Sequence, residues 1–194
     1  YLNHGYFPFY KEQPETYFQR IREIINMTLE VELPGLRNID AVYIPKVKQL
    51  LQIIAESVPF FPNITKLSER IGVSRKSLLQ YLYAMTESKI IIALHKEAMG
   101  ITKLQKPDRI FLGNSNFMEA LAMDGVNTGT VRETFFINQL KESNPIQYTT
   151  VGDFFVNNKY TFEIGGKSKT RKQISEVADS YIISDNIEIG YAEK

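Results

Sequence analysis

Two acidic residues and a lysine lie close together in the stretch GDFFVNNKYTFEIGGKSKTRKQI, residues 152–174. Asp153 begins a run typical of a β-strand, and Glu163 lies ten residues later in a second such run. Asn157-Asn158 between the runs is typical of a hairpin turn, which would place both acids in one hairpin. Carboxylates arranged in this way can hold a divalent cation that polarises a phosphate, while a lysine stabilises the developing charge. The pattern therefore predicts a site for phosphodiester chemistry.

The lysine departs from the usual spacing of such a site. Metal-dependent nucleases of the PD-(D/E)xK type carry Glu-x-Lys on the second strand, whereas this chain has Glu163-Ile164-Gly165-Gly166-Lys167. Lys167 would lie about 13 Å along an extended strand from Glu163, instead of about 7 Å. The two glycines favour a bulge, which would either return the lysine to Glu163 or turn it away. The acids are equally compatible with polar residues at strand ends.

Candidate residues follow from this pattern. Glu133, on a preceding predicted helix, could add a third carboxylate. The candidate metal ligands are Glu133, Asp153 and Glu163, and the candidate catalytic residues are Asp153, Glu163 and Lys167. The chain has no Cys and only two His, so oxygen ligands must hold any metal, which favours Mg²⁺ or Mn²⁺.

The elements that position these residues form the last part of the chain. Helices are predicted over 117–123, 129–143 and 169–178, and strands over 146–151, 153–156, 159–165, 180–185 and 187–192. Thr130 is the expected cap of the 129–143 helix, with Glu133 completing a capping box. Residues 115–194 are thus expected to be a small α/β layer domain.

The middle of the chain carries a different pattern. Asn63 precedes a short apolar-periodic segment, Gly72 ends it, and Ser74 precedes a second one, which predicts a helix-turn-helix. A helix is expected over 44–59, and strands are expected over 89–94 and 108–114. Together these elements predict a winged helix over residues 44–114.

The predicted winged helix is basic. Residues 61–113 contain nine Lys and Arg against four Asp and Glu, in a chain of net charge +1. A basic segment of this kind favours a polyanion such as DNA, although a solvated face would have the same composition.

The outer face of the second helix supplies candidate DNA contacts. With Leu78 and Leu82 turned inward, the residues expected to face DNA are Arg75, Lys76, Ser77 and Gln80. Lys103 and Lys106 in the wing would reach phosphates. Tyr81 and Tyr83 on this helix would also suit a surface that binds protein.

The first 43 residues contain a predicted helix over 14–33, ended by Pro34-Gly35. The chain begins in apparent mid-domain sequence and lacks a GxxxxGK[ST] loop, so we expect a fragment whose ATP site, if any, lies upstream. It has no apolar run of membrane-spanning length and no secretory leader, so we expect a cytoplasmic protein without a membrane partner.

The order of these features resembles the C-terminal region of bacterial and archaeal AAA-type ATPases. The segments that carry the resemblance are YLNHGYFPFY, PNITKLSERIGVSRKSLLQYL, LQKPDRIFLGN, RETFFINQL and GDFFVNNKYTFEIGGKSKTRKQI. In that family the ATPase module is followed by a winged helix and a domain of unknown function with a PD-(D/E)xK nuclease-like fold.

The resemblance implies an overall α+β or α/β organisation. Residues 1–43 would be a helical remnant of the ATPase lid, 44–114 the winged helix and 115–194 the nuclease-like domain. Glu133, Asp153 and Glu163 would match the acidic positions of the family, and Gln173 a polar position after them. The implied function is a DNA-binding or regulatory module of an ATP-binding parent protein, without catalysis by this fragment. A Mg²⁺-dependent nuclease and a protein-interaction module that couples the ATPase to a partner are the alternatives. The expected partners are DNA and the upstream ATPase module, and a homo-oligomer is also compatible with the resemblance.

Overall fold

The first part of the protein is a long, nearly continuous helical segment. The computed structural model describes residues 1–37, 39–96, 105–121 and 125–187. After two short 3-10 turns, Pro8–Tyr10 and Pro14–Thr16, helix α1 spans Tyr17–Met27. A π-helical turn, Thr28–Glu32, leads into α2, Leu33–Arg37. The expected stop at Pro34-Gly35 is wrong, because the helical segment continues through both residues to Arg37.

Two capped helices and a hairpin follow. A 3-10 turn, Ala41–Tyr43, precedes α3, Ile44–Ala55. Helix α4 spans Ile64–Ile71, and the Asn63 side chain accepts a hydrogen bond from the Lys66 amide; α5 spans Arg75–Glu87 under a Ser74 cap. Gly72 between them adopts a φ of +71°, which glycine allows without strain. These caps and this turn confirm the sequence prediction for the two helices.

The hairpin is antiparallel. Strand β1, Ile91–Leu94, pairs with β2, Arg109–Leu112. Phe60 extends this small sheet by exchanging two backbone hydrogen bonds of 2.8 Å with Ile110. The expected pair of strands is therefore present, with shorter bounds.

Helices α6, Ser115–Leu121, and α7, Thr128–Leu140, connect the hairpin to the second sheet. Asn127 caps α7, and its side-chain oxygen accepts from the amides of Gly129 at 2.8 Å and Thr130 at 3.3 Å. The prediction of Thr130 as the cap is wrong. The helix begins at Thr128, and its cap lies three residues before Thr130, so the Thr130 amide is itself one of the donors that need a cap.

The second sheet has the order β3-β4-β5-β6. Strands β3, Ile146–Tyr148, β4, Phe154–Val156, and β5, Tyr160–Gly165, are antiparallel, and β6, Ser180–Ser184, pairs parallel to β5. Asn157 and Asn158 form the β4–β5 turn with φ of +55° and +52°, as the sequence predicts. The strand expected over 187–192 lies almost entirely outside the described residues.

The helix expected over 169–178 is wrong. The segment contains one 3-10 turn, η5, Arg171–Gln173, followed by turns. Ser180 donates from its hydroxyl to the carbonyls of Ile174 and Val177, and Arg171 donates to the Ser180 hydroxyl at 2.8 Å. Isolated helices of about ten residues are marginal, so hydrogen bonds to Ser180, which β6 holds beside β5, can replace the helix.

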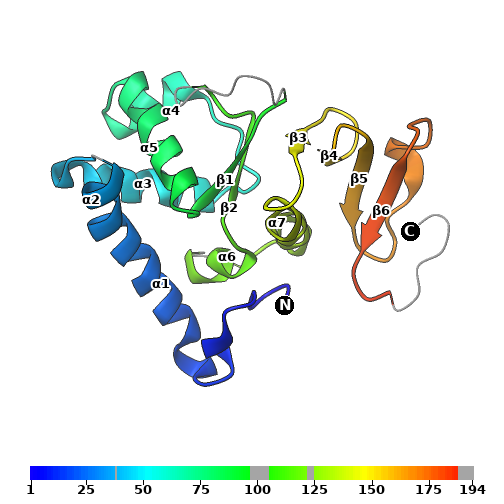
Figure 1. The fold of residues 1–194 in the computed structure, drawn as a ribbon, viewed down its shortest axis with the longest axis horizontal. Helices are drawn as coiled ribbons and strands as arrows, with labels where there is room; N and C mark the ends of the chain where they lie inside the picture. Colours follow the sequence, from blue (N-terminus) through cyan, green and yellow to red (C-terminus); the bar gives the residue numbers. More distant parts are fainter. Residues whose placement is uncertain (38, 97–104, 122–124, 188–194) are drawn as a thin grey trace.

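The elements form a mixed α+β structure with two small sheets. Figure 1 shows α1 to α5 and the hairpin in one part, the second sheet in another, and α7 between them. A core of residues from Tyr17 to Val131 joins α1, α3, α5, β1, β2 and α6. A smaller core around Phe111, Ile137 and Phe154 joins the hairpin to α7 and the second sheet. Both cores thus include residues from either side of the boundary expected at 114/115, and the domain limits remain predictions.

Candidate functional site

Glu163 is the most deeply buried acid of the predicted site. It lies in β5 with 2% of its surface exposed, and its partner is the ammonium group of Lys169, with which it forms an ion pair. A buried carboxylate needs such a partner, because burying an unpaired charge is costly. The lysine that neutralises Glu163 is therefore six residues away in sequence.

A tight turn after β5 brings Lys169 back over the strand. The Lys169 amide donates to the Gly166 carbonyl at 2.9 Å, which closes a turn over residues 166–169. An added Cβ on Gly165 would lie 2.6 Å from Cβ and Cγ of Lys169 and 2.8 Å from its Cδ. The missing side chain of Gly165 thus makes room for the Lys169 stem. This explains the glycine at position 165.

Asp153 lies immediately before β4 and is tied to β5. Its Oδ2 accepts from the Ile164 amide at 2.7 Å, and its own amide donates to the Phe162 carbonyl at 2.8 Å. These bonds hold Asp153 beside the strand that carries Glu163. Sequence reasoning placed both acids in the hairpin, and the structure brings them together there.

Glu133 reaches the same region from α7. Burial is the main cause that raises its pKa to about 7, and the negative charges of Asp153 and Glu163 add to the effect. The positive charges of Arg109 and Lys169 oppose it. Its Oε2 is enclosed and has no hydrogen-bond partner. At neutral pH this carboxyl is therefore poised between its protonated and ionised forms, as expected for a group that could exchange a proton.

The negative charges of all three acids act on Lys169. Burial by itself lowers the pKa of Lys169, but the hydrogen bond and charge of Glu163, with the charges of Asp153 and Glu133, raise it above its ordinary value. Lys169 therefore remains charged at neutral pH. The site is thus a set of three acids and one ammonium group, contributed by α7, the start of β4, β5 and the turn after β5.

The other predicted residues of this region lie elsewhere. Lys167 is exposed in the turn, and Gln173 is exposed in η5. The sequence signal that could have pointed to Lys169 is the Gly165-Gly166 pair. If the chain reverses direction at Gly166, a lysine beyond Lys167 is better placed to return to Glu163. Arg109 lies in β2, and its charge lowers the pKa of Glu133. No local sequence pattern could link the two residues, because they are 24 positions apart.

The donor types of the site suit Mg²⁺ or Mn²⁺, since all three acids offer oxygen. Among the described residues, however, no group of three or more His, Cys, Asp or Glu side chains is gathered closely enough to hold a metal ion. Lys169 instead engages Glu163. As the structure shows them, these three acids are therefore not a formed metal site.

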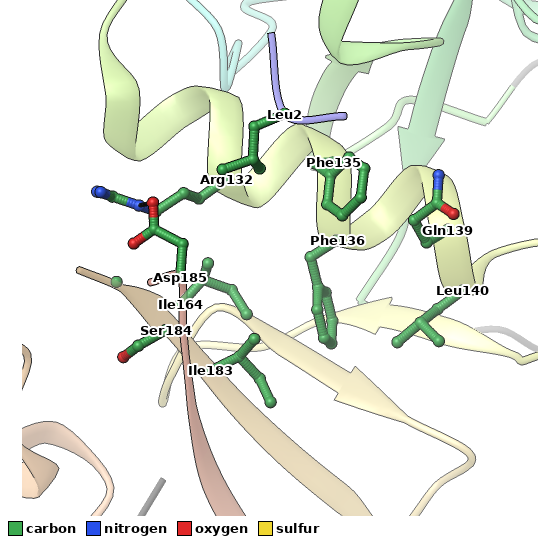
Figure 2. A pocket seen from close by; sticks show the side chains of 11 residues that line it. Leu2, Arg132, Phe135, Phe136, Gln139, Leu140, Ile164, Ile183, Ser184 and Asp185 are labelled. Carbon is green, nitrogen blue, oxygen red and sulfur yellow. Dashed lines mark ion pairs between the residues drawn. The ribbon is translucent and has the colours of Figure 1, made fainter. Parts of the chain in front are cut away.

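A pocket of about 290 Å³ lies beside the site, between α7 and the ends of β5 and β6. Figure 2 shows Phe135, Phe136 and Leu140 of α7 facing it, with the ion pair of Arg132 and Asp185, 2.9 Å apart, at one end. Its walls are mainly apolar, so this pocket does not resemble a phosphate site.

The DNA contacts predicted on α5 also have defined positions. The side chains of Arg75, Lys76 and Gln80 are exposed, while Leu78, Leu82 and Met85 on the same helix are buried. Ser77 is half-buried, and its hydroxyl lies 2.9 Å from that of Ser74. Lys106 is exposed at the end of the hairpin loop, and Lys103 lies outside the described residues. Helix α5 and strand β5, which carries Glu163, lie in different parts of the structure (Figure 1).

Comparison of the chain with protein-family models, with curated proteins and with solved structures gave no match. In the part of the chain that the structure describes, no helix is both long and apolar enough to cross a bilayer.

Proposed function

We propose that this chain is a DNA-binding module in which the exposed face of α5 contacts DNA. The observation that carries the proposal is the sidedness of this helix: Arg75, Lys76 and Gln80 are exposed, whereas its apolar residues are buried. Lys and Arg bind phosphates or guanine, and Gln pairs with adenine. In this proposal the chain follows an AAA-type ATPase module and couples it to DNA.

The elements around α5 support this use. Helix α4, the Gly72 turn and the capped α5 are followed directly by the β1–β2 hairpin, the order of elements in a winged helix. The Ser74 cap fixes the start of α5, so Arg75 and Lys76 occupy its first turn. This places them at the end of the helix that reads base edges in helix-turn-helix proteins. Lys106 would add a phosphate contact from the hairpin.

The test is the salt dependence of duplex DNA binding by the wild type and by the double variant Arg75→Ala/Lys76→Ala. If both residues contact phosphates, the variant should bind more weakly, and the slope of log affinity against log salt should fall by about 1.8. The matched control is Lys11→Ala/Lys159→Ala, which removes two exposed charges outside α5. Equal losses in both double variants would contradict a specific role for α5. No DNA binding by the wild type would favour a module that binds a protein partner.

A second candidate function, phosphodiester hydrolysis, is favoured by the convergence of Glu133, Asp153, Glu163 and Lys169. In this proposal Glu133, Asp153 and Glu163 would have to come closer together than the structure shows to hold Mg²⁺ or Mn²⁺, which would then supply Lewis-acid polarisation of a phosphate. Lys169 would then offer its charge to the phosphate instead of to Glu163. Lys167, the residue favoured by the sequence spacing, would remain at the rim.

Calorimetric titration with Mg²⁺ or Mn²⁺ tests this second candidate without requiring activity. The wild type should show saturable binding that Asp153→Ala and Glu163→Gln remove. Glu176→Gln, an exposed acid in the turns after β5, is the control and should bind like the wild type. Absence of binding by the wild type would contradict the metal site and leave the DNA-binding proposal in place.

A further inference from the structure

The guanidinium group of Arg109 contacts two aromatic rings close to the acidic site. The guanidinium carbon of Arg109 lies 5.0 Å from the ring centre of Phe61 and 4.7 Å from that of Tyr148. These three residues come from the loop before α4, from β2 and from β3. We call them the Phe61–Arg109–Tyr148 stack.

The backbone holds the stack at both ends. Phe60, next to Phe61, exchanges two hydrogen bonds of 2.8 Å with Ile110, next to Arg109. At the other end the Tyr148 amide donates to the His95 carbonyl at 3.0 Å. These bonds tie the backbone next to Phe61 to β2, and the backbone of Tyr148 to the residue that follows β1.

Phe61 remains open to solvent although it is an apolar ring. It is 57% exposed, while Pro62, which follows it, is buried. Arg109 carries a full positive charge beneath this ring, and its Nε and Nη1 are enclosed without a hydrogen-bond acceptor. An exposed ring over a cation combines a stacking surface with a positive potential, the two features that proteins use to bind unpaired nucleotides.

The stack also adjoins the acids. The positive charge of Arg109 lowers the pKa of Glu133, whereas the negative charges of Asp153 and Glu163 raise it. Lys106, three residues before Arg109, is exposed and would add positive charge on the approach.

From these contacts we propose that the Phe61–Arg109–Tyr148 stack binds an unpaired nucleobase of a nucleic acid, which lies on the outer face of Phe61. The inference rests on the proposed nucleic-acid function and adds to it a preference for single-stranded segments. A base pair inside a duplex offers no free face to such a ring, whereas an unpaired base does.

The experiment compares binding of a labelled single-stranded oligothymidine and of a duplex of the same length by fluorescence anisotropy. Phe61→Ala should weaken binding of the single strand by about 5- to 150-fold, the range reported by alanine substitution of stacking residues. Duplex binding, assigned to α5, should not change. Phe61→Tyr keeps an aromatic face and should bind like the wild type. Tyr181→Ala, which truncates an aromatic residue that is 44% exposed on β6, is the matched control.

The outcomes separate the two proposals. Unchanged single-strand binding by Phe61→Ala, or an equal loss for single strand and duplex, would overturn the stacking site while leaving DNA binding intact. Failure of the wild type to bind either nucleic acid would overturn both. Because Phe61 is largely exposed, its truncation should leave the fold in place, and circular dichroism of each variant checks this.

Discussion

Lys169 neutralises Glu163 from a position six residues further along the chain, across a turn that begins at Gly166. A lysine two residues beyond Glu163 would still lie in β5, and Lys167, four residues beyond, is exposed in the turn. The reversal instead returns the later lysine to the buried carboxylate, with Gly165 leaving space for its stem. The charge arrangement of the site thus depends on backbone geometry as much as on residue type.

Gly165→Ala should disrupt this arrangement. The added methyl would lie 2.6 Å from Cβ and Cγ of Lys169, atoms near the backbone that cannot swing aside easily. We expect a loss of about 1–3 kcal/mol in the free energy of unfolding, typical of overpacking, measured by urea denaturation. Gly125→Ala is the control, because a Cβ there meets nothing within 4 Å. Equal stability of the two variants would show that Lys169 does not need this space.

Glu133 should make stability depend on pH between about 4.5 and 7. Its pKa is raised from 4.5 to about 7 in the folded protein, so the folded state holds the proton more tightly than the unfolded state. The stability that this gives is complete below pH 4.5 and is lost as the pH rises to about 7. Replacement by Gln removes this titration.

Urea denaturation at pH 5 and pH 8 measures the effect. Between these values the stability of Glu133→Gln relative to the wild type should rise by about 2 kcal/mol, at 1.36 kcal/mol per pKa unit with allowance for partial solvation. Glu176→Gln, at an exposed position, should follow the wild type at both values. A constant difference between Glu133→Gln and the wild type would refute the raised pKa.

Asn127→Ala should destabilise α7, the helix that carries Glu133. The Asn127 side chain accepts from two amides in the first turn, and loss of such a cap costs about 1 kcal/mol. Thr130→Ala, at the position that sequence spacing favours, should change the free energy of unfolding by less than about 0.5 kcal/mol. Thermal or urea unfolding of both variants decides between the two caps, and a larger loss in Thr130→Ala would reverse the assignment.

Asn158 should tolerate glycine but not alanine. Its φ of +52° is costly for a residue with a Cβ and without a local polar group, so Asn158→Ala should lose about 1 kcal/mol of stability. Asn158→Gly avoids that strain and gives up only an exposed hydrogen bond from Gln147. The pair of variants controls for loss of the side chain, and equal unfolding free energies would mean that the turn relaxes to another conformation.

Local features of the fold could be predicted from the sequence because neighbouring residues decide them. Asn63 and Ser74 cap the helices that follow them, Gly72 makes the left-handed turn between those helices, and Asn157-Asn158 forms the β4–β5 turn. Each depends on hydrogen bonds or dihedral preferences within a few residues. The same local rules placed Asp153 and Glu163 in one hairpin.

Only the tertiary structure decided which groups meet around those acids. Glu133 approaches from α7, Arg109 is held near it by rings from two other segments, and the turn at Gly166 selects Lys169. The segment after this turn has helical periodicity but is held by Ser180 in a non-helical form. The sequence by itself therefore determined the elements and the two hairpin acids. Burial and contacts between distant segments determined the charge partners and the proton affinity of Glu133, because these depend on packing that no short stretch encodes.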